Sequence, residues 1–329
     1  MRASAKGKPS GNGTATLFLA VDGGGSKTHA VVVDCQGSVR GRGTAGSSNL
    51  RAIGVEQALA QLHLAIGEAL PARDARCDVD AAWFGLAGIH GADGANLLAP
   101  HLLSVAREVA ITNDAEFALA GLDNGPGVAL IAGTGSIALG RDVSGQMIQV
   151  GGWGHLLGDE GSAYDIGRRA AQAAARAADG RGPTTALLQL VLERWGLTAP
   201  RSMIDHVYLT QEKAPIASLA PGVLALARHG DLVARTIRRQ ACEELAQAAI
   251  AVIDALDVAD PVPLILGGGL LIHQRELRVA VVARIRRRRA LGRVTLIKEP
   301  ALWAARSLAA RARSMSGDGI MAEKTGSAL

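Results

Sequence analysis

Short apolar runs alternate with turn residues over the first part of the chain. Residues 17–21 are apolar and stop at Asp22 and three glycines, and residues 29–34 form a second, β-branched run. A Gln-Gly turn then lets residues 38–44 return as a third strand. Runs of this length, separated by turn residues, predict a three-stranded meander whose first turn is rich in glycine.

Helical and strand-like patterns follow in alternation. Apolar residues at helical spacing predict a helix at 55–70, and later segments predict a strand at 80–86, a helix at 94–103, a strand at 108–112 and a short helix at 115–122. The strand at 108–112 runs into Asn113 and Asp114. The first part of the chain therefore has the order β-β-β-α-β-α-β-α.

The same order recurs in the second part of the chain. Strands are predicted at 127–132, 137–142, 147–151, 263–266 and 293–297, with helices at 277–289 and 301–313. An additional helical insert covers about 162–256, with strong helical spacing at 165–178 and 234–256 and a connection at 198–221. The order predicts two α/β domains, at 16–118 and 119–313, related at the level of the fold.

Both chain ends lack this patterning. Residues 1–15 are polar and predict a disordered leader, and the Gly/Ser/Lys-rich residues 314–329 predict a flexible tail. No segment offers the roughly 20 consecutive apolar residues of a membrane span. We therefore expect neither a secretory signal nor a membrane partner.

Composition is that of an ordinary globular protein, with 48% hydrophobic residues and a net charge of +5. The three cysteines form no CxxC pair, so a disulfide framework is not expected and the cytoplasm is the natural compartment. The dense basic run at 284–289 is read as a solvated helix face, because aromatic residues are too few for nucleic-acid stacking.

The first glycine-rich turn offers groups that bind phosphate. It reads Asp22, Gly23, Gly24, Gly25, Ser26, Lys27, Thr28. Glycines allow close backbone approach to a phosphate, and the hydroxyls and the lysine add donors. Asp22 is a candidate for holding Mg²⁺ through water. The alternative is a tight hairpin that merely requires glycine.

Two further glycine-rich turns follow strands in the second half. Gly133, Thr134, Gly135 and Ser136 occupy the position equivalent to the first turn, and the pairing of two such turns favours a polyphosphate site. Gly267, Gly268 and Gly269 end a strand before a helix, where backbone can lie flat against a base or ribose. Asp114, at a strand end, is a candidate general base or, alternatively, a helix N-cap.

The set DGGGSKT, NDA, AGTGS and LGGG, with the segment WGHLLGDEGSAY at 153–164, resembles the N-acetylglucosamine kinase and BadF/BadG/BcrA/BcrD ATPase branch of the sugar kinase, actin and heat-shock ATPase superfamily. The resemblance runs from about residue 17 to residue 312. It implies a duplicated actin-like, ribonuclease H-like fold with an interdomain cleft, and ATP and Mg²⁺ as cofactors. It also implies phosphorylation of an amino sugar, with N-acetylglucosamine as the first expectation.

The resemblance also assigns roles to residues. It places the catalytic base on Asp114, beside Asn113 in the substrate site, and a sugar hydroxyl contact on Asn49, whose alternative is a turn residue. It further implies sugar contacts from Trp153, Gly154, Asp159 and Glu160. The alternatives are a core role for Trp153 and a helix cap for Asp159.

Several functions stay open at this point. Glucosamine or N-acetylmuramic acid are alternative acceptors, and an ATPase that activates a dehydratase is a further alternative. A non-catalytic sugar sensor is disfavoured because the glycine turns, Asp22 and Asp114 are all present. The resemblance also raises a homodimer, whose surface the sequence does not identify. No nucleic-acid partner is expected.

Overall fold

The structure is a computed structural model that describes residues 2–4, 16–25, 27–70, 79–89, 91–122, 125–210, 212–256 and 260–324. Its contacts divide the chain into two compact units. The first comprises Met1–Asp123 and Glu299–Leu329, and the second comprises Asn124–Lys298. Each unit is built on one mixed β-sheet.

The sheet of the first unit has six strands in the order β1-β6-β5-β2-β3-β4. The strands are β1 (Arg2–Ser4), β2 (Leu17–Gly23), β3 (Thr28–Asp34), β4 (Val39–Ala45), β5 (Val79–Leu86) and β6 (Glu108–Thr112). Strands β2, β3 and β4 form the expected antiparallel meander, and β5 and β6 run parallel to β2. The carboxyl ends of the three parallel strands therefore lie at one edge of the sheet.

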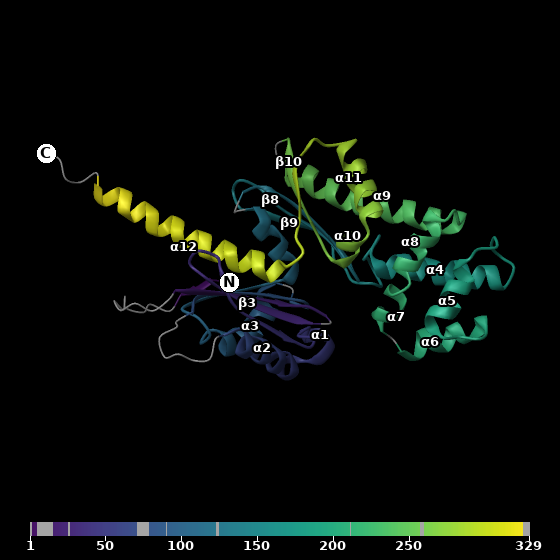
Figure 1. The fold of residues 1–329 in the computed structure, drawn as a ribbon, viewed down its shortest axis with the longest axis horizontal. Coiled ribbons are helices and arrows are strands. Elements are labelled where there is room, and N and C mark those ends of the chain that lie inside the picture. The colour runs from purple at the N-terminus through teal and green to yellow at the C-terminus, as the bar shows by residue number, and fades with distance from the viewer. Residues whose placement is uncertain are drawn as a thin grey trace. The chain divides into compact units, whose positions relative to one another are not determined.

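Successive side chains of β2 point to opposite faces of this sheet, and each face has its own hydrophobic core. Leu17, Leu19 and Val21 pack in one core with α2 (Val55–Ala69) and α3 (Gly91–Leu102), which follow the short α1 (Leu50–Ile53). Phe18 and Ala20 pack on the other face with the 3₁₀ helix η1 (Asp114–Leu122) and with α12 (Pro300–Lys324). Figure 1 shows α12 along one side of these strands and α2 on the opposite side.

The sheet of the second unit has five strands in the order β11-β10-β7-β8-β9. The strands are β7 (Gly127–Ala132), β8 (Ser136–Arg141), β9 (Met147–Gly151), β10 (Val262–Gly267) and β11 (Leu291–Leu296). Again three strands form an antiparallel meander, while β10 and β11 are parallel to β7. The order matches that of β6-β5-β2-β3-β4 strand for strand.

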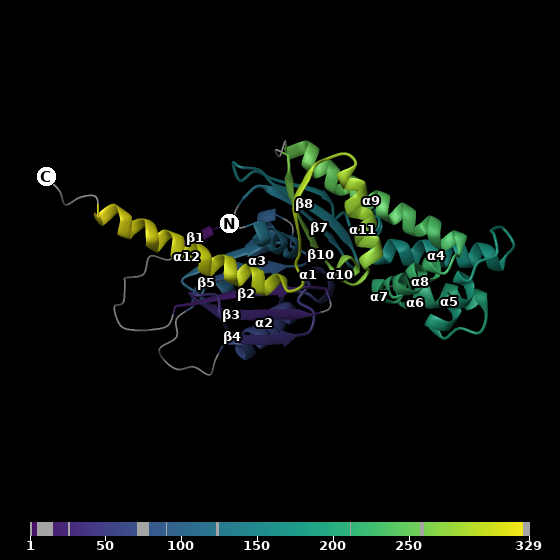
Figure 2. The same cartoon turned by 45° about the horizontal axis from the view of Figure 1, so that its top comes forward.

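Helices of the second unit form a single large core with its sheet. They are α4 (Ala163–Ala178), α5 (Leu187–Trp195), η2 (Pro200–Ser202), α6 (Met203–Thr210), α7 (Lys213–Ala217), α8 (Ala220–Arg228), α9 (Leu232–Leu256), α10 (Gly269–His273) and α11 (Arg275–Arg286). Buried positions of α9 such as Ala249 and Val252 share this core with Val128 and Leu130 of β7. The helices α4 to α8 gather beside α9 (Figure 2).

The duplicated actin-like topology expected from the sequence is confirmed by these two matching sheets. Three local features differ from the expectations. Residues 2–4 of the expected leader pair with β6 as an antiparallel strand, and α12 continues to Lys324 through the expected tail. The expected connection at 198–221 contains η2, α6 and α7. Residues 5–15 and 325–329 lie outside the described residues.

The closing helix joins the first unit rather than the second. Glu299–Leu329 groups with Met1–Asp123, because alanines of α12 pack against β2, β3 and β5. The sequence pattern predicts a first domain that ends at residue 118 and a second domain that includes residues 301–313. Among the described helices, none has both the length and the apolar character of a membrane span.

Candidate active site residues in the two units

Two carboxylates lie at strand ends of the first unit, near enough for the charge of one to affect the pKa of the other. Asp22 lies near the end of β2, and Asp114 follows β6 at the start of η1. Burial raises the pKa of Asp22 to about 7, and the negative charge of Asp114 adds to this effect. Such a pair favours binding of a proton or a cation, since two ionised carboxylates repel each other in a partly desolvated place.

Asn113 supplies the side-chain cap that the sequence analysis considered for Asp114. The N–H of Ala115 donates to Oδ1 of Asn113, two positions earlier, at 3.0 Å. The same N–H lies 3.0 Å from Asp114 Oδ1. The Asn113 amide nitrogen donates to the carbonyl of Ile89 at 2.9 Å. Asn113 is thus engaged at both ends of its amide and fixes the start of η1, which in turn positions Asp114.

Asn49 has one internal role and one available donor. Its Oδ1 accepts the N–H of Arg51 at 3.0 Å and caps α1. Its amide nitrogen has no hydrogen-bond partner within the described part of the chain, and it lies beside the glycine turn, 3.8 Å from the position that a Cβ on Gly25 would occupy. The cap explains why an asparagine or aspartate is suited to this position, and the amide nitrogen stays compatible with a sugar contact.

The first glycine turn is tied to the loop that carries Asn49. Thr28 is fully buried, donates to the carbonyl of Gly46 at 2.7 Å, and lies 2.8 Å from the hydroxyl of Ser48. A Cβ on Gly23 would lie only 2.4 Å from Ser48 Oγ, so this position requires glycine. Thr28 therefore has an internal role in the structure. Lys27 is exposed, and Ser26 lies outside the described residues.

The two glycine-rich loops of the second unit lie side by side. They follow the neighbouring parallel strands β7 and β10. A Cβ on Gly268 would lie 2.4 Å from the carbonyl oxygen of Ala132, and one on Gly133 would lie 3.5 Å from the nitrogen of Gly269. The structure thus brings together two of the three segments that the sequence analysis assigned to the nucleotide.

Asp159 stabilises the turn at 133–136 by accepting a hydrogen bond from it. It is 5% exposed and has a positive φ of 60°, and its Oδ1 accepts the N–H of Ser136 at 3.1 Å. A Cβ on Gly135 would lie 2.7 Å from the same oxygen. The other carboxylate oxygen lies 4.0 Å from Lys213 Nζ. Ser162 caps α4, so the alternative of Asp159 as a helix cap is wrong.

Glu160 contributes its backbone to the same arrangement. Its carbonyl accepts the hydroxyl of Ser136 at 2.7 Å. The N–H of Ala163 bonds to the carbonyl of Gly133 at 2.9 Å, and that of Tyr164 bonds to Thr134 at 3.2 Å. Together with the bond from the Ser136 N–H to Asp159, four hydrogen bonds therefore join the 159–164 segment to the glycine turn.

Trp153 is not a core residue. Its side chain is 75% exposed, and the neighbouring Leu156 and Leu157 are 83% and 79% exposed. Gly154, with φ of 82°, accepts the N–H of Gly158 at 2.7 Å and closes a tight loop. An exposed aromatic on such a loop is suited to stacking on a ligand. His155 packs edge-on against Tyr164, and burial, followed by the charge of Lys213, lowers its pKa.

Two residues that contact the glycine turn of the first unit or Asp159 were not predicted from the sequence. Ser48 joins Thr28 and the 46–49 loop, and its only signal was a second hydroxyl in the GSSN segment. Lys213 reaches Asp159 from α7, more than fifty positions along the chain, and no local pattern indicates it. Among the described residues, no group of three or more His, Cys, Asp or Glu side chains could hold a metal.

Known proteins resemble most of this chain. An N-acetylmuramic acid/N-acetylglucosamine kinase of Clostridium acetobutylicum is 34% identical over 259 residues, covering 77% of this chain and 85% of that protein. An N-acetyl-D-glucosamine kinase of Dictyostelium discoideum is 33% identical over 270 residues, with the same coverage.

A solved structure from Chromobacterium violaceum, described as an N-acetylglucosamine kinase, superimposes with a TM-score of 0.71 at 30% identity. It covers 90% of this chain and 99% of its own. The model of the BadF/BadG/BcrA/BcrD ATPase family matches residues 19–305. The chain therefore belongs to the BadF/BadG/BcrA/BcrD ATPase family.

Proposed function

We propose that the chain is an ATP-dependent kinase that phosphorylates an amino sugar, with N-acetylglucosamine as the substrate and its 6-hydroxyl as the acceptor. The observation that carries the proposal is the pair of carboxylates, Asp22 and Asp114, beside the glycine turn of the first unit. Phosphoryl transfer to a hydroxyl needs a bound polyphosphate, a positioned acceptor and a base. Asp22 fits the binding of the polyphosphate through magnesium, and Asp114 fits the base. The names of the relatives supply the sugar.

The glycine turns bind the nucleotide in this proposal. In the first unit, phosphate contacts are proposed for Gly23, Gly24 and Gly25 with Lys27. In the second unit, they are proposed for the 133–136 turn. The Gly267–Gly269 loop serves the base or ribose. Narrow turns without side chains allow backbone N–H groups to approach phosphate oxygens closely.

Asp22 and Asp114 also fit a magnesium ion. Mg²⁺ in nucleotide sites takes one or two protein carboxylates and completes its shell with phosphate oxygens and water. Burial is the main cause of the raised pKa of Asp22, and a bound cation would offset that effect. The ion, when bound, supplies neutralisation of phosphate charge, and we propose Asp22 as the residue that holds it through water.

Asp114 is the proposed general base. As the acceptor oxygen forms its bond to the γ-phosphorus, the bond from that phosphorus to the β–γ bridging oxygen breaks and ADP departs. The hydroxyl proton passes to the Asp114 carboxylate, which need only accept it late in the reaction. The cap at Asn113 holds Asp114 at the start of η1.

The sugar is bound in this proposal by Asn49, through its side-chain amide nitrogen, and by the exposed Trp153 with Gly154. Asn113, Asp159 and Glu160 were also expected at the sugar. Their internal bonds favour a supporting role in which they hold Asp114 and the 133–136 turn, and a sugar contact for them remains a prediction.

N-acetylmuramic acid is the second acceptor to consider, because the C. acetobutylicum relative carries it in its name. It differs from N-acetylglucosamine by a lactyl ether on the third carbon, so the same 6-hydroxyl is available. A panel of N-acetylglucosamine, N-acetylmuramic acid and glucosamine distinguishes the acceptors.

The test is a coupled ADP-release assay with that panel, on the wild-type chain and on Asp114→Ala. We expect sugar-dependent release from the wild type and a loss of at least about a hundredfold in the variant, while MgATP affinity changes little. Glu108→Gln, an exposed carboxylate on β6 of the same sheet, is the matched control. Sugar-independent ATP hydrolysis as the sole activity, or full activity in Asp114→Ala, contradicts the proposal.

The cellular setting follows the same proposal. ATP and the unpaired thiols of Cys35 and Cys242 favour the cytoplasm. A homodimer remains a prediction from the resemblance, and size-exclusion chromatography with light scattering would test it.

A further inference from the structure

A groove of about 600 Å³ runs between α9 and α11 in the second unit. Its volume lies in the range of small-molecule sites, which is about 300–1,000 Å³. None of its lining residues belongs to the glycine loops or to the 153–164 segment. The groove is therefore a place separate from the residues assigned to nucleotide and sugar.

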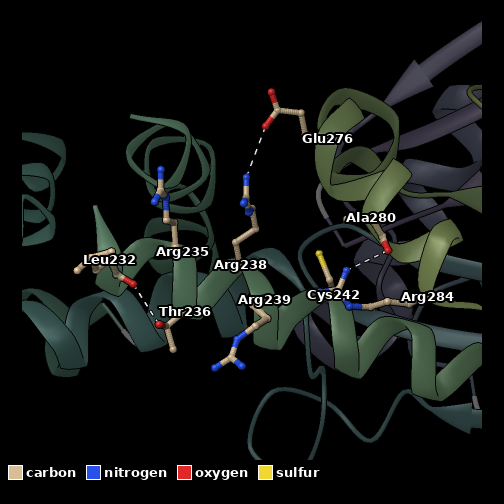
Figure 3. Close-up of a pocket in the computed structure, with 9 residues that line it drawn as sticks. All are labelled: Leu232, Arg235, Thr236, Arg238, Arg239, Cys242, Glu276, Ala280 and Arg284. Carbon is tan, nitrogen blue, oxygen red and sulfur yellow. Dashed lines mark hydrogen bonds and ion pairs between the residues drawn. The ribbon is translucent and has the colours of Figure 1, made fainter. Parts of the chain in front are cut away.

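Positive charge dominates the lining of this groove. Four arginines and one glutamate line it, and the arginines come from both helices. Figure 3 shows Arg235 and Arg238 side by side and extended in the same direction, while Arg284 reaches toward Cys242 from α11. The Arg239 side chain extends in the opposite direction. Arg284 belongs to the basic run that the sequence predicted to be solvated, yet it is only 24% exposed.

The ion pairs that two of these arginines make within the chain are weak. Arg238 Nη1 lies 3.6 Å from Glu276 Oε2, and Arg284 Nε lies 3.3 Å from Glu243 Oε2. The two glutamate side chains are 57% and 67% exposed, and ion pairs of this kind contribute at most about 1 kcal/mol. A ligand with greater charge can therefore displace them.

Backbone carbonyls orient two of the guanidinium groups without saturating them. Arg284 Nη1 donates to the carbonyl of Ala280 at 3.1 Å, and Arg235 Nε donates to that of Ala227 at 3.2 Å. A guanidinium has five N–H donors, so each fork retains donors for a ligand. The orientation is thus established before a ligand arrives, which lowers the cost of binding.

The chemistry of the lining selects the ligand. Arginine forks match the oxygens of a phosphate group, often in pairs of hydrogen bonds. Leu232, Ala280 and Cys242 supply apolar surface beside them, which suits a short carbon body. We propose that this groove binds a small phosphomonoester, such as the phosphate ester of a sugar or polyol, through Arg235, Arg238 and Arg284.

The test is isothermal titration calorimetry of the full chain with glycerol 3-phosphate, in the presence of saturating magnesium and a non-hydrolysable ATP analogue. The analogue keeps the probe out of the nucleotide site. We expect one site per chain, weakened about tenfold or more in Arg238→Gln and in Arg284→Gln, as for loss of a charge-assisted hydrogen bond. Arg288→Gln, which removes an exposed arginine of the basic run that does not line the groove, should bind within about twofold of wild type.

Added sodium chloride should weaken binding, and glycerol should not bind. Thermal melts of the ligand-free variants verify folding, and either of the two groove variants decides the question if the other does not fold. Absence of binding at millimolar probe, unchanged affinity in the groove variants, or an equal loss in all three variants overturns the proposal. The last result would indicate a general charge effect rather than a site.

Discussion

Replacement of Asp22 by asparagine should stabilise the ligand-free protein at alkaline pH while it abolishes phosphoryl transfer. The pKa of Asp22 is raised from 3.8 to about 7, chiefly by burial and secondly by Asp114. A carboxyl whose pKa is raised by folding keeps its proton in the folded state and loses it in the unfolded state between these two values. Stability therefore falls as the pH rises from about 4 to about 7, and the loss persists above pH 7.

The size of the effect follows from the same two values. A tenfold change in an acid constant corresponds to about 1.4 kcal/mol, so an ionised Asp22 costs at most about 4 kcal/mol of unfolding free energy. Asp22 retains some solvent exposure, and an asparagine amide in its place needs hydrogen-bond partners of its own. We therefore expect Asp22→Asn to gain about 1–2 kcal/mol at pH 8 and nothing at pH 4.

Urea denaturation of wild type and Asp22→Asn from pH 4 to pH 8, with EDTA and without nucleotide, measures this difference. Glu108→Gln is the control for removal of a charge from an exposed site of the same sheet, and it should show no such growth with pH. A variant that is less stable than wild type at pH 8, or a difference that does not change with pH, would refute the reasoning. Magnesium with ATP should stabilise the wild type more than the variant.

Three further substitutions test the supporting contacts. Thr28→Val removes a buried hydroxyl that bonds to Gly46, so the free energy of unfolding by urea should fall by about 1–3 kcal/mol, whereas unchanged stability would contradict an internal role. Gly135→Ala brings a methyl group to 2.7 Å from Asp159, and calorimetry should show weaker binding of the ATP analogue; wild-type affinity would argue against the turn as a nucleotide contact. Trp153→Ala should leave the melting temperature within a degree or two, because the ring is 75% exposed, and should raise the KM for sugar; a large loss of stability would show a packing role instead.

Regular elements were predictable wherever apolar periodicity and turn residues agreed. The strands at 108–112 and 127–132 were located to the residue, because each lies between clear breaks. The short helices at 203–210 and 213–217 were not predicted, since prolines and polar residues resemble a connection and only packing in the helical cluster stabilises them.

Site chemistry was predictable by residue type more than by role. The glycine turns, Asp22 and Asp114 follow from local pattern, and the structure brings them to strand ends as expected. The contact of Asp159 with Ser136 depends on a positive φ and on a loop that folds back by 23 positions, and no local pattern encodes either. The contact of Lys213 with Asp159 could not be predicted either, because the two residues are more than fifty positions apart in the sequence.

The return of the last helix to the first unit has a consequence for biosynthesis. Asn124–Lys298 is one uninterrupted segment, whereas the core around Phe18 and Trp83 needs Ala301, Ala304 and Ala305 from the far end of the chain. On the ribosome, the second unit can therefore complete its core while the first still exposes an apolar sheet face. A chain cut short near residue 298 would leave that face uncovered, so damage at the carboxyl end would appear as misfolding at the amino end.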